Sequence, residues 1–156
     1  MSELLSARVA GFLDLHHVMS LATVGPSGPH AVNLFYARDG LALVWVSEAG
    51  ARHSLELEAE RAVAATIAAD TADFTAVRGV QMHGRARRVD DPAETVRLRG
   101  LLADRYTFLK RLDALPERLR DAVARVSLYR LDPDQVVLID NARGFGHKET
   151  LVLQRS

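Results

Sequence analysis

Short apolar runs separated by turn-forming residues fill the first fifty positions of the chain. The run 18–24 is apolar and β-branched and stops at the Gly-Pro-Ser-Gly-Pro stretch 25–29, which predicts a strand followed by a turn. The runs 30–38 and 41–47 flank the Asp-Gly pair 39–40, which suits the positive φ of a two-residue turn. These two runs therefore predict a β-hairpin.

Strand character recurs in the rest of the chain. The further predicted strands are residues 62–69, 76–89, 126–131, 135–139 and 147–155. The first of these predicts a buried strand, and the second is long and alternating, with Gly79 and Gly84 permitting bulges or close approach. The Asp-Pro-Asp stretch 132–134 separates two of the predicted strands.

Helical periodicity appears in three places. Apolar residues near the N-terminus recur at i, i+4, i+7 and i+8, namely Leu5, Val9, Phe12 and Leu13. Ser54 is a predicted N-cap for a short helix over 55–61. Pro92 opens a helical insertion that extends to about residue 125, with Pro116 in the first turn of its second helix.

The order of these elements predicts the fold class. Six or seven strands joined mostly by hairpins lack the regular βαβ alternation of a doubly wound sheet. We expect a mostly β, α+β fold: an antiparallel barrel of six to seven strands with peripheral helices, since closure removes exposed strand edges. Residues 1–156 are expected to form one domain.

Composition and charge exclude several classes of function. The 20 basic and 20 acidic side chains balance, so nothing favours a nucleic acid as partner. The absence of cysteine excludes disulfides, thiolate metal sites and cysteine nucleophiles, and the six histidines match no recognised ligand spacing, so no metal is expected. Neither a membrane span of about 20 apolar residues nor a signal peptide is evident, and we expect a cytoplasmic protein.

Residues 47–54 are the strongest local candidate for a binding site. A strand ends there, a loop with a glycine follows, and Arg52, His53 and Ser54 lead into a helix. A guanidinium, hydroxyl groups and the free amides of a first helical turn together suit an anion. The alternative is that Ser54 only caps the helix while Arg52 and His53 are solvated.

The stretch 141–148 is a predicted loop, because two glycines surround an aromatic residue there. Phe145 could stack on a ring while Lys148 or Arg143 meets an anionic group. The alternative is a loop that packs Phe145 into the core.

These segments together resemble the FMN-binding split β-barrel proteins related to pyridoxamine 5′-phosphate oxidase. The resemblance covers about residues 15–90 and rests on HHVMSLATVGPSGPHAVNLFYA, SEAGARHS and VRGVQMHG, with DNARGFGHK beyond them. It implies that a flavin lies along one strand and contacts the end of the following strand. It also implies that an Arg and the basic residue after it bind the flavin phosphate. In this chain the implied cofactor-binding residues are His30, Ala31, Val32, Asn33, Val46, Ser47, Arg52, His53, Ser54 and Gln81, with Phe145 and Lys148 as further candidates. Gln81 has the alternative role of an outward polar residue on its strand.

The chain also departs from that enzyme. His30 stands where the enzyme has an Arg, and Phe35 where it has a Lys near the flavin; its arginine-rich C-terminal pattern is not evident. The motifs look like a less characterised bacterial branch, similar to the YhbP-like group. The resemblance implies a homodimeric FMN protein that performs flavin redox chemistry on an unknown small molecule other than pyridoxamine 5′-phosphate. The alternatives are a flavin- or haem-binding protein without turnover, serving storage or sensing, and a deazaflavin-dependent reductase.

Overall fold

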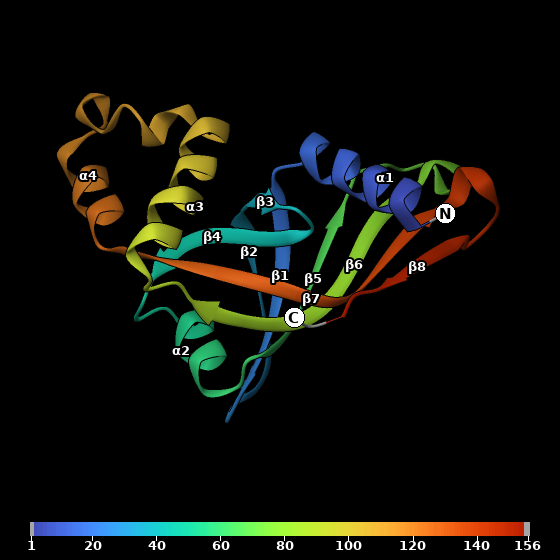
Figure 1. The fold of residues 1–156 in the computed structure, drawn as a ribbon, viewed down its shortest axis with the longest axis horizontal. Helices are drawn as coiled ribbons and strands as arrows, with labels where there is room; N and C mark the ends of the chain where they lie inside the picture. Colours follow the sequence, from blue (N-terminus) through green and yellow to red (C-terminus); the bar gives the residue numbers. More distant parts are fainter. Residues whose placement is uncertain (1, 155–156) are drawn as a thin grey trace.

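The computed structural model describes residues 2–154 (Figure 1). Its helices are α1 (Ser2–Leu15), α2 (Arg52–Ala59), α3 (Pro92–Arg105) and α4 (Glu117–Ala124), with short 3₁₀ turns η1 (Phe74–Ala76), η2 (Thr107–Leu109), η3 (Leu112–Ala114) and η4 (Asn141–Arg143). Its strands are β1 (Val18–Gly25), β2 (Gly28–Phe35), β3 (Ala37–Asp39), β4 (Ala42–Glu48), β5 (Ala62–Ala68), β6 (Arg78–Arg88), β7 (Val126–Asp140) and β8 (Lys148–Val152). The mostly β fold with peripheral helices is confirmed.

One antiparallel sheet contains all the described strands. Their order is β2-β1-β5-β6-β7-β4-β3, with β8 pairing with β7. The sequence neighbours β2 and β3 therefore lie at opposite ends of this order although only Tyr36 separates them. The sheet must curl until its two ends meet at Tyr36, which makes it a split barrel.

The single strand predicted over 30–38 is divided at Tyr36. The Tyr36 side chain is fully buried, its Oη donates to the Leu13 carbonyl at 2.7 Å, and its backbone N–H donates to the His17 carbonyl. These contacts fix the point where the chain leaves β1 and joins β4. The predicted hairpin forms between β3 and β4, and Gly40, with φ +62°, follows the terminal pair Asp39↔Ala42.

Two predicted strands around residues 132–134 are in fact one, because β7 runs without a break through Pro133. Its partner β6 shifts register between His83 and Gly84, so that Asp134 is the extra residue of a bulge. Gly84 lies opposite Pro133, and a Cβ on Gly84 would be only 2.1 Å from the Asp132 carbonyl oxygen. The close approach expected of Gly84 is thus confirmed.

Most inward side chains form one core inside the barrel. α1 covers one end of it through Val9, Phe12 and Leu13. β5 is buried on one face only rather than on both, because its alternate residues face outward. No helix among residues 2–154 is long and apolar enough to cross a membrane.

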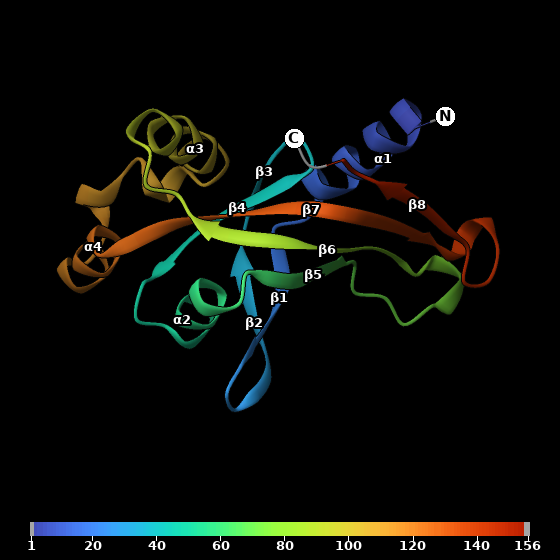
Figure 2. The ribbon, with the colours of Figure 1, turned by 60° about the horizontal axis from the view of Figure 1, so that its bottom comes forward.

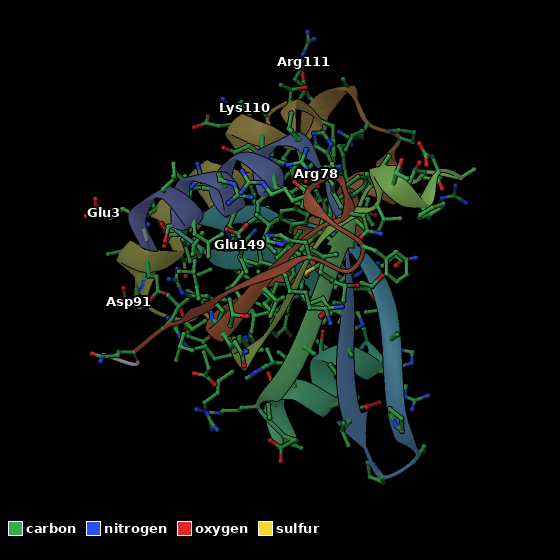
Figure 3. All side chains as sticks on the ribbon, turned by 90° about the vertical axis from the view of Figure 1, so that its right-hand side faces the viewer. Glu3, Arg78, Asp91, Lys110, Arg111 and Glu149 are labelled. Atoms are coloured by element: carbon green, nitrogen blue, oxygen red, sulfur yellow. The ribbon has the colours of Figure 1, made fainter. Side chains whose placement is uncertain are left out.

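A second, smaller core joins the helical region to the sheet. Leu98, Leu102 and Tyr106 of the predicted insertion pack against Val44 of β4 and Leu128 of β7. Figure 1 shows α3 and α4 beside one end of β4 and β7, away from α1. Figure 3 shows the β1–β2 hairpin extending from the body of the molecule, with α2 beside it.

Candidate functional site

Two strand edges without a partner strand border the split of the barrel. β2 pairs only with β1, and β3 pairs only with Ala42–Val44 of β4. The pairing of β3 with β4 ends at Ala37 and Val44. Beyond Val44, this side of β4 has no partner strand, because the chain before Tyr36 belongs to β2 and pairs with β1 instead. Figure 2 shows β2 and β4 diverging from this point. We call the space between β2 and residues 45–48 of β4 the wedge.

The residues expected to lie along a flavin fall on these edges. Ala31, Val32 and Asn33 are in the middle of β2, while Val46 and Ser47 are near the end of β4. On β2 the side chains alternate: Ala31 and Asn33 are exposed, and Val32 is half-buried against the core. On each of these edges, the backbone N–H and C=O groups that point away from the paired strand have no partner strand. These groups can therefore bind a planar heterocycle from the side.

The start of α2 closes one end of the wedge. His53 Nε2 lies 2.9 Å from Ser47 Oγ, and both side chains are buried. Burial lowers the pKa of His53, and the nearby His30 lowers it further, while Glu56 opposes the effect. His30 pairs with Thr23 across the β1–β2 hairpin. A hydroxyl and two imidazoles are therefore brought together at this end.

Arg52 stands beside them and is held by Glu56 from the next turn of α2. Arg52 Nε donates to Glu56 Oε1 at 2.5 Å, and about half of the Arg52 side chain is exposed. Within residues 2–154 the terminal nitrogens of Arg52 have no hydrogen-bond partner, so they remain donors for an anion. Thr23 Oγ1 donates to the other carboxylate oxygen of Glu56 at 3.4 Å, and the Glu56 side chain fills the space over Gly25.

Ser54 does not cap the helix, which corrects the prediction from sequence. α2 begins three residues earlier than predicted, at Arg52, and its N-cap is Ala51, which makes no side-chain cap bond. Ser54 therefore lies inside the first turn, where its side chain is fully buried and its Oγ has no hydrogen-bond partner. The alternative that His53 is solvated is also wrong, because only 7% of it is exposed.

Gln81 belongs to a row of polar side chains on the outer face of the sheet. In the strand register, Asn33 pairs with Ser20, Ser20 with Thr66, and Thr66 with Gln81. All four are exposed, and Ser20 Oγ donates to Asn33 Oδ1 at 2.8 Å. Gln81 is thus outward and polar, on the face that it shares with Asn33.

Phe145 and Lys148 are not brought to α2 within one chain. Figures 1 and 2 both place the loop between β7 and β8 at the opposite end of the molecule from α2. Phe145 is 86% exposed and meets the ring of Phe74 edge-on, so the alternative that it packs into the core is wrong. Lys148 begins β8 and is exposed.

Sequence reasoning missed Thr23 and Glu56. The i, i+4 spacing of Arg52 and Glu56 is a recognisable helical ion-pair signal. It becomes visible only when the helix start is placed at Arg52 instead of after Ser54. Nothing near Thr23 in the sequence indicates its contact with α2.

Comparisons with known proteins agree with this architecture. A family model described as pyridoxamine 5′-phosphate oxidase matches residues 5–140. A UPF0306 protein of Cronobacter sakazakii is 28% identical over 145 residues, which cover 90% of each chain.

Two mycobacterial structures have similar folds. A conserved hypothetical protein of Mycobacterium tuberculosis superposes with a TM-score of 0.73 at 23% identity, covering all of this chain and 94% of that one. A heme binding protein of Mycobacterium smegmatis gives 0.72 at 22% identity. That alignment covers 94% of this chain but only 57% of the smegmatis protein.

Proposed function

Because this chain belongs to the pyridoxamine 5′-phosphate oxidase family, we propose that it binds FMN in the wedge and uses it for redox chemistry on a small molecule. One observation carries the proposal. A guanidinium with free donors, a histidine and a serine hydroxyl meet at the start of α2, at one end of two open strand edges. This combination suits a phosphate joined to a planar ring.

The phosphate end of the proposed site consists of Ser47, Arg52 and His53. Arg52 offers two terminal nitrogens, and the first-turn amides of α2 add donors and a partial positive charge. Ser54 Oγ, buried and without a partner, is a further hydroxyl in this turn. The carboxylate of Glu56 offsets the positive charge of Arg52. Binding of a phosphate dianion therefore depends on the hydrogen bonds donated by this end of the site and, at lower pH, on the positive charge of protonated His53.

The ring end consists of the strand edges. Backbone groups of Ala31, Val32 and Asn33 would meet the ring from β2, with Val46 on the opposite side. Gln81 lies on the outer face of β6, with β1 and β5 between it and β2, so it is not part of this end within one chain. A bound flavin supplies hydride and electron transfer, while the chain supplies position and electrostatics. No side chain is needed as a nucleophile.

We propose a homodimer because Phe145 and Lys148 cannot reach the wedge of their own chain. A second copy packed on the outer sheet face could bring them to it. That face carries exposed apolar side chains such as Val18 and Phe35, which a partner would cover.

The substrate is a small molecule other than pyridoxamine 5′-phosphate. Phe35 is 56% exposed and contacts the ring of Tyr106, so it presents an aromatic surface where the enzyme that names the family has a cation. The Phe35 side chain has neither a positive charge nor a hydrogen-bond donor for a substrate phosphate. We place the protein in the cytoplasm, where reduced cofactors are available.

The first experiment identifies the cofactor. The protein is purified without added cofactor, its visible spectrum is recorded, and the compound released on denaturation is identified by mass. A flavin spectrum that bleaches with a reductant and recovers with an acceptor supports the proposal. A haem band or a deazaflavin would instead support the corresponding alternative, and a flavin that cannot be reduced would support a binding protein without turnover.

The second experiment tests Arg52 with two ligands. Losing a charge-assisted hydrogen bond typically costs about 1.5–3 kcal/mol, or about 10- to 150-fold in affinity. Arg52→Ala should therefore weaken FMN by about this factor and riboflavin, which lacks the phosphate, far less. Arg118→Ala, an exposed arginine on α4, serves as the control. Equal losses for the two ligands, or no loss, would refute the assignment.

A further inference from the structure

A pocket of about 340 Å³ lies between α3, α4 and the sheet. Its volume is at the lower end of the range typical of small-molecule sites. Among the described residues that line it, Arg99 is the only charged one, and the others are apolar. Arg99 is itself exposed, and its Nη2 donates to the Val126 carbonyl at 3.1 Å. The pocket therefore suits an apolar ligand.

This pocket adjoins one edge of the wedge. Val46 lies in the part of β4 that borders the wedge, and it also lines the pocket. Its half-buried side chain packs against the second core, on the side of β4 that faces α3. Side chains stand out of the plane of a sheet, whereas the open edge of a strand lies in that plane. Val46 is thus a neighbour of both the wedge and the pocket.

The end of α3 also reaches the other edge of the wedge. The ring of Tyr106 lies 5.3 Å from that of Phe35 at the end of β2, and Tyr106 Oη donates to the Tyr36 carbonyl at 2.5 Å. The Tyr106 N–H donates to the carbonyl of Leu102, and its own carbonyl accepts from the N–H of Leu109. Leu102 and Leu109 both line the pocket. The segment 102–109 therefore extends from the pocket to the point where β2 and β4 diverge.

The two ends of the wedge consequently differ in polarity. Ser47, Arg52 and His53 lie at the α2 end, whereas aromatic rings and the apolar pocket lie at the Tyr36 end. Arg105 is beside Tyr106, but its guanidinium donates to the backbone carbonyls of residues 13 and 16. A molecule that approaches the wedge from this end meets mainly apolar surface.

α4 covers the pocket without burying its own apolar side chains. Leu119 and Val123 are four positions apart and share one face of α4, yet no residue of this helix is buried. Leu119 remains 44% exposed, while Val123 and Ala124 line the pocket. A surface helix normally buries its apolar stripe. An apolar ligand in the pocket would supply part of the surface that α4 lacks.

We propose that this pocket holds the substrate of the flavin wedge, and that this substrate is a small uncharged apolar molecule. The inference rests on the proposed function, because it places a flavin ring and the substrate on either side of Val46. A charged group would lose its hydration among these side chains and gain little in return.

The test measures binding to the purified protein with any cofactor that it retains. 1-Naphthol, which is uncharged near pH 7, and 1-naphthoate, an anion with the same rings, are titrated by calorimetry. We expect 1-naphthol to bind at least about tenfold more tightly, since the carboxylate must be desolvated. On protein that carries flavin, 1-naphthol should also shift the flavin absorption bands.

Pocket-filling variants locate the ligand. Ala124→Phe should weaken 1-naphthol by at least about tenfold, because the added ring takes the space of the ligand. Ala124 is exposed at the end of α4, so this change leaves the core intact. Ala103→Phe, on the α3 wall, is the second such variant. The matched control is Ala93→Phe, an exposed position of α3 outside the lining, which should keep the affinity unchanged.

Several results would overturn the proposal. If 1-naphthol fails to bind a protein that carries flavin, the pocket is rejected and the flavin site stands. Tighter binding of 1-naphthoate would reject the uncharged class, and equal losses in Ala124→Phe and Ala93→Phe would place the ligand elsewhere. Binding through the pocket without a shift of the flavin bands would reject its role as the substrate site. A protein without flavin would refute the proposed function and this role together, and calorimetry on the variants would still decide whether the pocket binds apolar molecules.

Discussion

Asp39 connects the β3–β4 hairpin to α3 and β7, and replacing it with Asn should destabilise the fold in a pH-dependent way. Its carboxylate accepts hydrogen bonds from Arg97 and Arg130, which hold the pKa of Asp39 at about 2, below its usual 3.8, although partial burial acts in the opposite direction. The depressed pKa means that the folded state binds the ionised form better than the unfolded state does.

The shift of this pKa sets the magnitude. A fall from 3.8 to about 2 corresponds to roughly 2.5 kcal/mol, at about 1.4 kcal/mol for each pKa unit. About a quarter of the carboxylate side chain is exposed, so solvent screening reduces this and we expect about 1–2 kcal/mol. The contribution is fully present above pH 3.8 and is lost as the pH falls towards 2.

The assay is urea denaturation of the wild type and of Asp39→Asn at pH 6 and near pH 2. The difference in unfolding free energy should be about 1–2 kcal/mol at pH 6 and should shrink towards zero at the lower pH. Asp90→Asn removes a carboxylate that is 75% exposed beside Arg88, and it should change stability by less than about 0.5 kcal/mol. A difference that is absent at pH 6, or unchanged on acidification, would refute the reasoning.

Three more predictions test the site and the sheet. The affinity of FMN relative to riboflavin should begin to rise only when the pH falls below 6.5, because burial lowers the pKa of His53 from that ordinary value and keeps the ring neutral above it. His53→Lys should bind FMN more tightly at pH 8 and flatten this titration, and an unchanged titration would count against His53. Gly84→Ala should cost at least about 1–3 kcal/mol in thermal or urea unfolding because its Cβ would meet the Asp132 carbonyl, whereas Gly100→Ala, in open space on α3, should stabilise by about 0.5–1 kcal/mol. Ser54→Ala should leave the melting temperature of the flavin-free protein unchanged or raised, since Ser54 Oγ has no partner; a clear loss of stability would reveal a contact of that hydroxyl.

Elements set by local pattern were predictable from the sequence. The β3–β4 hairpin, the long β6 and the helices after Pro92 all follow from turn residues and periodicity within the segments themselves. The division at Tyr36 was not predictable, because it depends on which strand each half of the segment joins. The continuity of β7 through Pro133 depends on Gly84, far away in the sequence, which has no Cβ to collide with that backbone.

The candidate site shows the same limit. The spacing of Ser47, Arg52 and His53 indicated a cluster, and the structure brings the three side chains to the start of α2. Their role towards a flavin stays a prediction. The helix start was misplaced because a serine was favoured over Ala51 as N-cap, and the contact of Glu56 with Thr23 depends on how α2 packs against the sheet.

The open edge of β2 has a consequence for how the protein behaves when it is concentrated. An eight-residue strand with one unpaired side offers its backbone groups to any other strand, and proteins usually protect such edges with charged residues or a cover. β2 carries no lysine, arginine or carboxylate, and Pro29 interrupts its donors only near one end. A ligand lying along this edge would therefore also block the addition of another strand. Higher occupancy of the wedge would then make the protein more resistant to aggregation.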